Sequence, residues 1–475
     1  MRGKQRALLG AGALLAGTAI GVLARQKTPI AADRKSRGSF ALHNRGLVPV
    51  GQSGWTRPEG EAPSYPVLDQ SIDADVVVVG AGLAGSSLAL HLAEAGLSVA
   101  VLETRQPGWG ASGRNAGHVL PIFKDMALLD SFPMGGKAFR EAFRAHHTIP
   151  FDLAEKHGID CDAVRSGYLN AAVSRGEFEK FRDAFAYLER DGFQKVYLLG
   201  AADMQAAMGS TYYPYGVMFE NGGRVNPYLL THGIIARAAA LGAKVYGGSE
   251  ALSLEPVGTR WRVRTAQGDV LADRVVFCTA AYPTDIVPAF ETCFYPLTAY
   301  ALTTKPLGAE ADALIMPGGA TLAQVPVDLN PLVKDRHGRL ILSSLPSVSH
   351  PQDGEAHFRN QLAWIHTVWP ESRAMDIRLD QYWTGRVAMR TREFPGAYDM
   401  GGGVYGLMHF NAWGNVMAPL MGKLLAEGLA NDAPDTLPFP LEKPRAVLYR
   451  PQQELLLRRT LLPVARLGQK LGLLR

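Results

Sequence analysis

Cysteine is scarce in this chain, and its three cysteines lie far apart. Cys161, Cys278 and Cys293 are the only ones among 475 residues. Three scattered thiols cannot build a disulfide framework, and without a Cys-x-x-Cys pair the zinc sites built on such pairs are excluded. We therefore expect no metal site and a core held by apolar burial, for which the 47% content of hydrophobic residues is sufficient.

The chain also lacks a large excess of charge, because its formal net charge is only +5. Residues 1–60 hold ten Lys or Arg and two acidic residues, and residues 443–475 hold eight Lys or Arg and one acidic residue. A nucleic-acid-binding protein would carry its basic face on a folded domain. Positive charge at the two chain ends suits an anionic membrane surface better, so we expect no nucleic-acid partner.

Long uncharged runs are few, and the clearest one lies at the N-terminus. Residues 7–24 follow the basic stretch MRGKQR and are rich in Gly and Ala. We interpret residues 1–25 as a membrane anchor or a cleaved signal, with neither as the third alternative. Residues 26–71 are rich in Arg, Ser, Gly and Pro and are expected to be a linker. The chain is thus expected to be membrane-associated or exported, with the side of the membrane left open.

The folded body is expected to begin near Ile72 with a β-α-β unit. DADVVVVG is a β-branched apolar run bounded by glycine, and LSVAVLE is a second such run. Between them, LAGSSLALHLAEAG has helical periodicity and ends at Gly96. A β-α-β unit of about 30 residues implies a parallel sheet and an α/β fold.

A dinucleotide-binding signature lies inside this unit. Gly80, Gly82 and Gly85 form Gly-x-Gly-x-x-Gly between the strand and the helix, and Glu103 ends the second strand. Such glycines permit a tight turn, close approach of a pyrophosphate and close helix packing, while the acid accepts ribose hydroxyls. The alternative is a glycine-rich helix start without a ligand. The signature by itself does not separate NAD from FAD.

The stretch GWGASGRNAGHVLP, residues 108–121, follows the signature with little side-chain bulk. Such a loop favours a large flat ring with backbone N–H groups donated to it. We expect residues 113–117 to lie under that ring, with His118 at its edge. A plain glycine-rich surface loop is the alternative. The expected cofactor contacts up to this point are Gly80, Ala81, Gly82, Leu83, Ala84, Gly85, Glu103, Thr104, Ser112, Gly113, Arg114, Asn115, Ala116, Gly117 and His118.

Five stretches in a fixed order resemble the D-amino-acid oxidase superfamily. They are ADVVVVGAGLAGSSLALHLAEAGLSVAVLE, GWGASGRNAGH, NGGRVNPYLLTHGIIARAAALGAKVY, ADRVVFCTAAYP and PLTAYALTTKPL. The resemblance covers roughly residues 73–435 and is nearest to the γ-glutamylputrescine oxidase-like branch, related to glycine and sarcosine oxidases. It implies FAD, a two-lobed fold and hydride transfer from a C–H next to an amine nitrogen.

The resemblance also assigns domains. It implies a Rossmann-type, glutathione-reductase-like FAD-binding domain made of residues 72–165, 222–285 and 395–435. It implies a second, antiparallel-sheet substrate domain made of residues 166–221 and 286–394. Residues 436–475 remain as a basic tail, in which leucine clusters alternate with Arg458, Arg459 and Arg466. That pattern indicates an interfacial amphipathic helix, and packing on the protein's own body is the alternative.

The resemblance places a glycine-rich turn before the last helix at the flavin. In the family that turn often reads Ser-Gly-His-Gly, whereas here Trp413 precedes Gly414 and stands where His is common. Asn415 and Val416 follow, where the sarcosine oxidase branch carries a lysine for a substrate carboxylate. This departure disfavours an N-methyl amino acid and leaves amines open. Gly414, Asn415 and Val416 complete the expected cofactor contacts.

The catalytic candidates are His118, Trp413 and Tyr300, each of which has a structural role as its alternative. An aromatic cage that keeps the substrate amine neutral draws its candidates from Tyr300, Trp369, Trp383, Tyr405 and Trp413. Further candidates are His409, and Arg386 for a substrate carboxylate or for a structural ion pair. Cys278 is expected in the core and not in a covalent flavin link.

Three functions stay open. The first is an FAD-dependent oxidoreductase that oxidises the CH–NH group of an amine or amino acid to an imine, with oxygen as the acceptor. The second is the same chemistry in a membrane dehydrogenase that delivers electrons to quinone. The third is an FAD-binding assembly or accessory factor without turnover, for which the altered turn at Trp413 leaves room.

Overall fold

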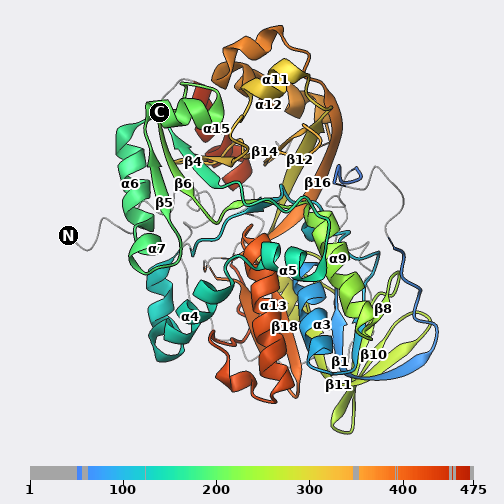
Figure 1. Cartoon of the computed structure of the whole chain (residues 1–475). Helices are drawn as coiled ribbons and strands as arrows, with labels where there is room; N and C mark the ends of the chain where they lie inside the picture. The colour runs from blue at the N-terminus through green and yellow to red at the C-terminus, as the bar shows by residue number, and fades with distance from the viewer. Residues whose placement is uncertain are drawn as a thin grey trace.

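Figure 1 shows the chain as a computed structural model. The structure describes residues 51–55, 63–123, 125–345, 352–390, 392, 394–448, 452 and 456–470. The expected signal or anchor, residues 1–25, lies outside these residues and stays a prediction. Among the described residues, no helix is long and apolar enough to cross a membrane.

The first sheet is built around the expected β-α-β unit. β1 (Ser71–Val79) lies parallel to β2 (Val99–Leu102), and α3 (Leu83–Glu94) connects them. On its other side β1 lies parallel to β11 (Asp269–Phe277). Burial of β1 from both faces explains why its sequence is a run of valines without alternation.

Distant segments complete this sheet, whose main path runs β17-β18-β11-β1-β2-β8. The added strands are β8 (Lys244–Tyr246), β17 (Gly396–Gly401) and β18 (Val404–Met408), and the hairpin of β9 (Ser253–Val257) and β10 (Arg260–Arg264) pairs with β11. β8, β2, β1, β11 and β18 are parallel neighbours, and β17 is antiparallel to β18. Parallel strands end at one edge, where the loops that build a ligand site meet.

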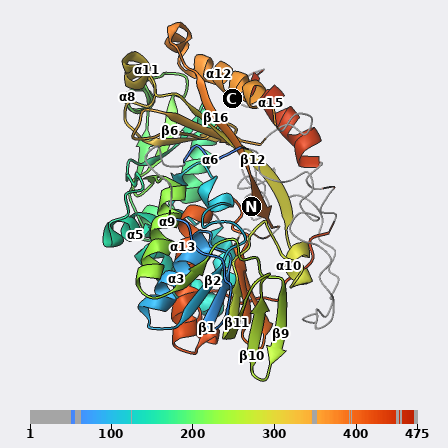
Figure 2. The ribbon, with the colours of Figure 1, turned by 90° about the vertical axis from the view of Figure 1, so that its right-hand side faces the viewer.

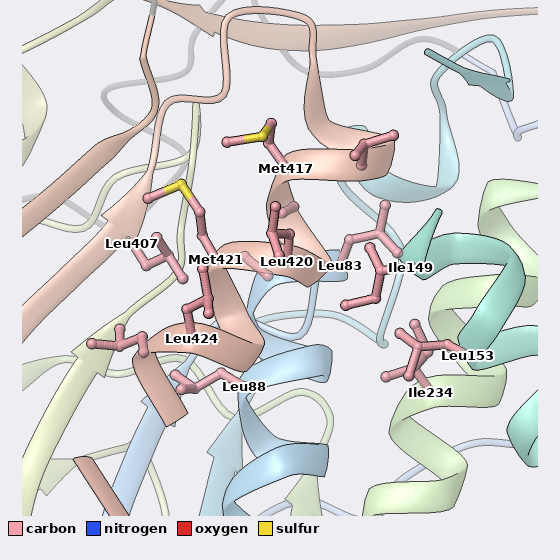
Figure 3. Close-up of a cluster of buried hydrophobic side chains, with 14 of the residues drawn as sticks. Leu83, Leu88, Ile149, Leu153, Ile234, Leu407, Met417, Leu420, Met421 and Leu424 are labelled. Carbon is pink, nitrogen blue, oxygen red and sulfur yellow. The ribbon is translucent and has the colours of Figure 1, made fainter. Parts of the chain in front are cut away.

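Helices cover one face of the first sheet (Figure 1). They are α3, α5 (Ile149–His157), α9 (Pro227–Ala240) and α13 (Gly414–Ala430). Figure 3 shows the apolar cluster at which they meet, with side chains from all four helices and from β18. The labelled members are Leu83, Leu88, Ile149, Leu153, Ile234, Leu407, Met417, Leu420, Met421 and Leu424. This packing holds the first turns of α3 and α13 near each other.

The second sheet lies above the first in Figure 1 and has the order β16-β12-β15-β14-β13-β4-β6-β5. Its strands are β4 (Tyr168–Ala172), β5 (Val196–Leu199), β6 (Tyr215–Phe219), β12 (Tyr295–Thr304), β13 (Thr321–Val325), β14 (Leu332–Lys334), β15 (Leu340–Ser344) and β16 (Leu379–Met389). β13 is parallel to β4, so the expectation of an antiparallel sheet was wrong at this pair. Because strands of the first sheet separate them along the chain, no hairpin sets their direction.

Further helices and a small sheet complete the described part of the fold. The remaining helices are α4 (Lys137–His146), α6 (Arg175–Phe185), α7 (Tyr187–Arg190), α8 (Ala201–Met208), α10 (Pro288–Thr292), α11 (Ala309–Leu314), α12 (Gly354–Val368) and α15 (Leu462–Lys470). A two-stranded sheet pairs β3 (His118–Val119) with β7 (Gly223–Arg224). It joins the glycine-rich loop to the segment that leads into α9.

Parts of the expected linker pack against the folded body. Trp55 is 1% exposed and Leu68 is fully buried. Ser71 already belongs to β1. The linker expectation was therefore wrong for residues 53–55 and for Ser71, whereas most of residues 63–70 are exposed apart from the buried Leu68.

The C-terminal tail packs on the protein's own body, which is the alternative that the sequence left open. Leu457, Leu462 and Ala465 are buried in one cluster with Tyr295 and Met389 of the second sheet. Figure 2 shows α15 beside this sheet. Val464, at 63%, and Leu467, at 56%, are exposed on the same helix. One part of the helix's apolar surface therefore packs against the protein, and another part stays exposed.

Candidate active site

One cavity of about 410 Å³ is lined by residues of both sheets. Its walls come from the β1–α3 turn, the glycine-rich loop after β2, the turn before α13, and strands β12 and β16 of the second sheet. The expected cofactor contacts line this cavity from three of these parts, except for Ala81, Gly85, Gly113 and Gly117. A long cavity between two lobes is a common place for a large ligand.

The β1–α3 turn is shaped for close approach of a ligand. Gly80 has φ +104°, a conformation that favours glycine. A Cβ on Gly85 would lie 1.9 Å from the Gly80 carbonyl oxygen, so only glycine lets α3 sit this close to β1. A Cβ on Gly82 would lie 2.8 Å from Ser112 Oγ, beside the cavity that both residues line. The α3 N-terminus therefore offers its positive end to a phosphate at a bare backbone.

Glu103 lies at the next position along the cavity. Its carboxylate accepts hydrogen bonds from the backbone N–H of Ala81 and of Arg105, each at 2.9 Å. Burial nevertheless raises the pKa of Glu103 above its ordinary value. Each carboxylate oxygen keeps lone pairs for further donors, and the neighbouring Thr104 also lines the cavity. This arrangement fits ribose hydroxyls.

Residues of the glycine-rich loop line the cavity, and two of its glycines lie outside the lining. Ser112, Arg114, Asn115, Ala116 and His118 are cavity residues. The buried Gly113 and Gly117 are not among them, so of residues 113–117, which were expected under the ring, only Arg114, Asn115 and Ala116 reach the cavity. A Cβ on Gly113 would meet the Gly108 carbonyl oxygen at 2.1 Å. These glycines serve close packing behind the loop.

A hydrogen-bond network ties this loop to the first turn of α13. Asn415 Nδ2 donates to Asn115 Oδ1 at 2.9 Å and to the His118 carbonyl oxygen at 2.8 Å. Asn115 Oδ1 also accepts from the Gly117 backbone N–H at 2.9 Å. Asn415, which stands near the position where the resembling family carries a substrate-binding lysine, therefore has a role in shaping the cavity.

The turn before α13 reaches the cavity through backbone conformations that are uncommon for residues with side chains. Asn411 and Ala412 have φ values of +51° and +58°. Each such residue costs about 1–2 kcal/mol, which the surrounding contacts must offset. Residues 411–416 line the cavity, with Gly414 at the start of α13. The turn thereby aims the helix N-terminus at the bound group.

Trp413 closes one end of the cavity with an aromatic wall. Its indole Nε1 donates to the Leu120 carbonyl oxygen at 3.2 Å. Its ring lies 5.5 Å from Phe123 and 6.4 Å from Phe143, measured between ring centroids. The indole is thus held in place from behind, with only 4% of the residue exposed.

His118 lies at the same end and is neutral at physiological pH. Burial lowers its pKa to about 4. Its Nε2 lies 3.3 Å from the Leu322 carbonyl oxygen, and its ring packs edge-on to Tyr168 at 5.6 Å between centroids. The carbonyl groups of Leu322 and Leu332 offset part of the pKa shift, because each favours a protonated imidazole.

The sequence analysis missed Asp328 and Tyr168, which also line the cavity. Asp328 accepts a backbone N–H from Gln324 at 3.2 Å, and burial by the surrounding protein raises the pKa of its carboxyl to about 7. Burial and then the charge of Asp328 raise the pKa of the Tyr168 hydroxyl. The sequence did offer a signal for Asp328, because it is the one acidic residue in the stretch TLAQVPVDLN and follows an apolar strand.

Other candidates take up different places. Tyr300 lines the cavity, but its hydroxyl accepts from Gln361 Nε2 at 2.9 Å in the second core cluster. Arg386 lines the cavity with its guanidinium 5.9 Å from the Tyr282 ring. Cys278 lines it too, and burial raises the pKa of its thiol, which makes a nucleophilic thiolate unfavourable.

Trp369, Trp383, Tyr405 and His409 lie outside the cavity lining. Trp369 Nε1 donates to the Met208 carbonyl oxygen at 2.7 Å inside the second core. The His409 ring stacks on Phe294, away from the cavity. The sequence analysis proposed these side chains as candidates near the substrate. The structure instead buries them in the core, as is common for large aromatic residues. No cluster of three metal-ligating side chains occurs in the described ranges.

Comparisons with known proteins agree with this geometry. The family model described as DAO, FAD dependent oxidoreductase, matches residues 75–428. The chain is 26% identical over 373 residues to "Probable oxidoreductase OrdL" of Rhizobium meliloti, covering 77% of this chain and 85% of that protein. It is 27% identical over 386 residues to "Gamma-glutamylputrescine oxidoreductase" of Escherichia coli, covering 78% of this chain and 86% of that protein.

Solved structures show the same fold. Glycine oxidase from Bacillus cereus superposes with a TM-score of 0.63 at 21% identity, covering 79% of this chain and 99% of that one. L-proline dehydrogenase from P. horikoshii superposes with a TM-score of 0.62 at 18% identity, covering 78% of this chain and 96% of that one. The α/β expectation is thereby confirmed, with mixed sheets. The family match confirms the resemblance and the FAD cofactor expected from the sequence, and the chain belongs to the DAO family of FAD-dependent oxidoreductases.

Proposed function

We propose that this enzyme oxidises the CH–NH group of an amine or amino acid to an imine. The observation that carries the proposal is one cavity that joins a dinucleotide cradle to an aromatic end containing His118, Tyr168 and Trp413. FAD bound there would supply the redox chemistry, because its flavin can accept a hydride. The name of the Escherichia coli relative, a gamma-glutamylputrescine oxidoreductase, supports an amine substrate.

The residues that would hold FAD fit its parts in order along the cavity. Gly80, Gly82 and the first turn of α3 suit the pyrophosphate, and Glu103 suits a ribose. Asn115 and residues 414–416 suit the flavin ring of FAD. The N-terminus of α13 would stabilise negative charge that develops there, because a helix N-terminus carries a partial positive charge.

The aromatic end would keep the reacting nitrogen neutral. An ammonium has no lone pair to assist loss of a hydride, and an environment poor in water lowers the pKa of a bound amine. His118 adds no positive charge, because its own pKa is about 4. Trp413 and Tyr168 would exclude water from this end.

Asp328 supports a substrate with a second charged group. A carboxylate beside the reacting nitrogen would favour its ammonium form, so Asp328 is better suited to a cationic group elsewhere on the substrate. Arg386 brings a positive charge to the same cavity, where a substrate carboxylate would be favoured. We therefore propose an amine that carries a further ammonium, with or without a carboxylate.

The test is an anaerobic titration of the purified full-length chain with monoamines, diamines, γ-glutamyl diamines, N-methyl amino acids and D-amino acids. Loss of the flavin absorbance band with one class supports the proposal and names that class. A flavin band that no compound bleaches would favour the accessory factor. A chain that binds no added FAD would overturn the assignment of the cavity.

The electron acceptor needs a second measurement on the substrate found. We propose oxygen as the acceptor, and stoichiometric hydrogen peroxide in air-saturated buffer is the expected result. Turnover with a soluble quinone and little peroxide would instead favour the dehydrogenase.

A further inference from the structure

Residues 51–55 precede the segment matched by the family model, yet they dock on the glycine-rich loop. We refer to residues 51–55 as the brace. Trp55 is 1% exposed and does not line the cavity. Its ring lies behind the loop, since a Cβ on Gly117 would meet Trp55 Cζ2 at 2.9 Å. The brace therefore contacts the loop from a side other than the one that faces the cavity.

Three consecutive carbonyl groups of the loop are held by side-chain donors. Ser53 Oγ donates to the Gly113 carbonyl oxygen at 2.6 Å, and Trp55 Nε1 donates to the Asn115 carbonyl oxygen at 2.7 Å. Between them, Trp383 Nε1 of β16 donates to the Arg114 carbonyl oxygen at 2.9 Å. Two of the three donors thus belong to the brace.

The brace is itself anchored from several elements. Asn226 Nδ2 donates to the Trp55 carbonyl oxygen at 3.0 Å, and Arg339 Nη1 donates to the Gly54 carbonyl oxygen at 3.2 Å. Arg114 Nη1 donates to the Gly51 carbonyl oxygen at 2.9 Å. Packing is also tight, because a Cβ on Gly54 would lie 2.7 Å from the Trp383 ring. Because the backbone carbonyls and the side chains of the brace are both held, the brace can fix the position of the glycine-rich loop.

The fixed carbonyls determine where the adjoining N–H groups point. A trans peptide unit is planar and directs its C=O and N–H to opposite sides. The carbonyls of Arg114 and Asn115 point to Trp383 and Trp55, so the N–H groups of Asn115 and Ala116 point away from these two indoles. No acceptor within the described residues is recorded for these two N–H groups, and both residues line the cavity.

We infer that the brace is a positioning element of the FAD site, which orients the backbone N–H groups of Asn115 and Ala116 toward the bound cofactor. The inference rests on the FAD site described above and extends it to residues outside the family match. It requires that loosening the brace weaken FAD binding and alter the surroundings of the flavin, even though Trp55 does not touch the cavity.

The experiment compares Trp55→Phe with Trp369→Phe in the full-length chain. Both substitutions remove one buried indole donor to a backbone carbonyl at 2.7 Å, but Trp369 lies in the second core, away from the loop. FAD is titrated into flavin-free protein while flavin fluorescence is followed. We expect Kd to rise about 3- to 10-fold for Trp55→Phe, the worth of one hydrogen bond, with a shift of the flavin absorption maximum. Trp369→Phe should bind FAD like the unmodified chain.

Ser53→Ala gives a second readout if Trp55→Phe does not fold. It removes only the hydroxyl that donates to the Gly113 carbonyl oxygen and accepts from the Trp55 backbone N–H at 3.3 Å. Weaker FAD binding by this variant would support the inference. Unchanged FAD affinity and spectrum in the folded brace variants, or equal weakening by Trp369→Phe, would overturn it while the FAD site stands. An unmodified chain that binds no FAD would instead overturn the site itself.

Discussion

At the scale of single residues, His118 and Asp328 both line the cavity, and burial shifts the pKa of each side chain. His118 is buried against Tyr168 and a backbone carbonyl, whereas Asp328 has one backbone N–H donor at 3.2 Å and faces the cavity. Desolvation disfavours the charged form of each, so it lowers the pKa of the histidine to about 4 and raises that of the carboxyl to about 7. Near pH 7 the imidazole is therefore neutral, whereas the carboxyl is close to half ionised.

Asp328→Asn is expected to raise KM for a substrate with a second ammonium about 10- to 100-fold, the worth of a charge-assisted hydrogen bond. The Asp328 carboxyl ionises as pH rises through about 7, so KM of the unmodified enzyme should fall over that interval. In the variant this dependence should be absent. Steady-state kinetics between pH 6 and 8.5 measure both effects.

Asp312→Asn is the matched control for Asp328→Asn, because Asp312 pairs with Lys334 at 3.3 Å outside the cavity. It should leave KM unchanged. Equal KM values for Asp328→Asn and the unmodified enzyme would contradict the proposed cation site, without affecting the FAD assignment.

His118→Gln is expected to change how stability depends on pH. The folded-state pKa of His118, about 4, lies below the ordinary value of 6.5, so only the unfolded chain takes up this proton between those values. The unmodified protein should therefore lose about 2–3 kcal/mol of stability from this group as pH falls from 7 to 4.5. Urea unfolding at both pH values should show a smaller loss for the variant. An equal loss in both proteins would contradict a buried neutral histidine.

At the scale of elements, the β1–α3 turn depends on a close approach that a side chain would prevent. In Gly85→Ala, the new Cβ would lie 1.9 Å from the Gly80 carbonyl oxygen, so α3 must move away from β1. We expect a loss of about 1–3 kcal/mol in unfolding free energy and a marked loss of FAD affinity. Chemical denaturation and FAD titration measure the two effects.

Gly176→Ala serves as the control for Gly85→Ala. Gly176 lies in α6, and an added Cβ there would meet nothing within 4 Å. This variant should be as stable as the unmodified protein or slightly more stable, because alanine is the better helix former. Full FAD affinity in Gly85→Ala would show that the turn tolerates the side chain.

At the scale of the whole molecule, membrane association stays a prediction. It rests on the uncharged run at residues 7–24 and on the basic chain ends, while the structure shows α15 packed on the second sheet. We expect the full-length chain to sediment with anionic phosphatidylglycerol vesicles more than with neutral phosphatidylcholine vesicles. High salt should weaken the electrostatic part. A chain that stays in the supernatant with both vesicle types would contradict the prediction.

Local sequence determined the parts of this protein that depend on short-range chemistry. The valine run of β1, the glycines at 80, 82 and 85 and the acid at Glu103 predicted a dinucleotide site, because strand burial, turn geometry and helix packing act within about 30 residues. The family resemblance added FAD, which the motif alone left undecided.

Tertiary structure alone decided what depends on contacts between distant segments. The parallel pair of β4 and β13, the place of Asp328 at the end of the cavity and the docking of Trp55 behind Asn115 each join residues far apart in the chain. It also separated Trp413, which lines the cavity, from Trp369, which lies in the core. Composition and periodicity carry no record of such pairings, because burial and hydrogen bonding at these positions are set by the fold as a whole.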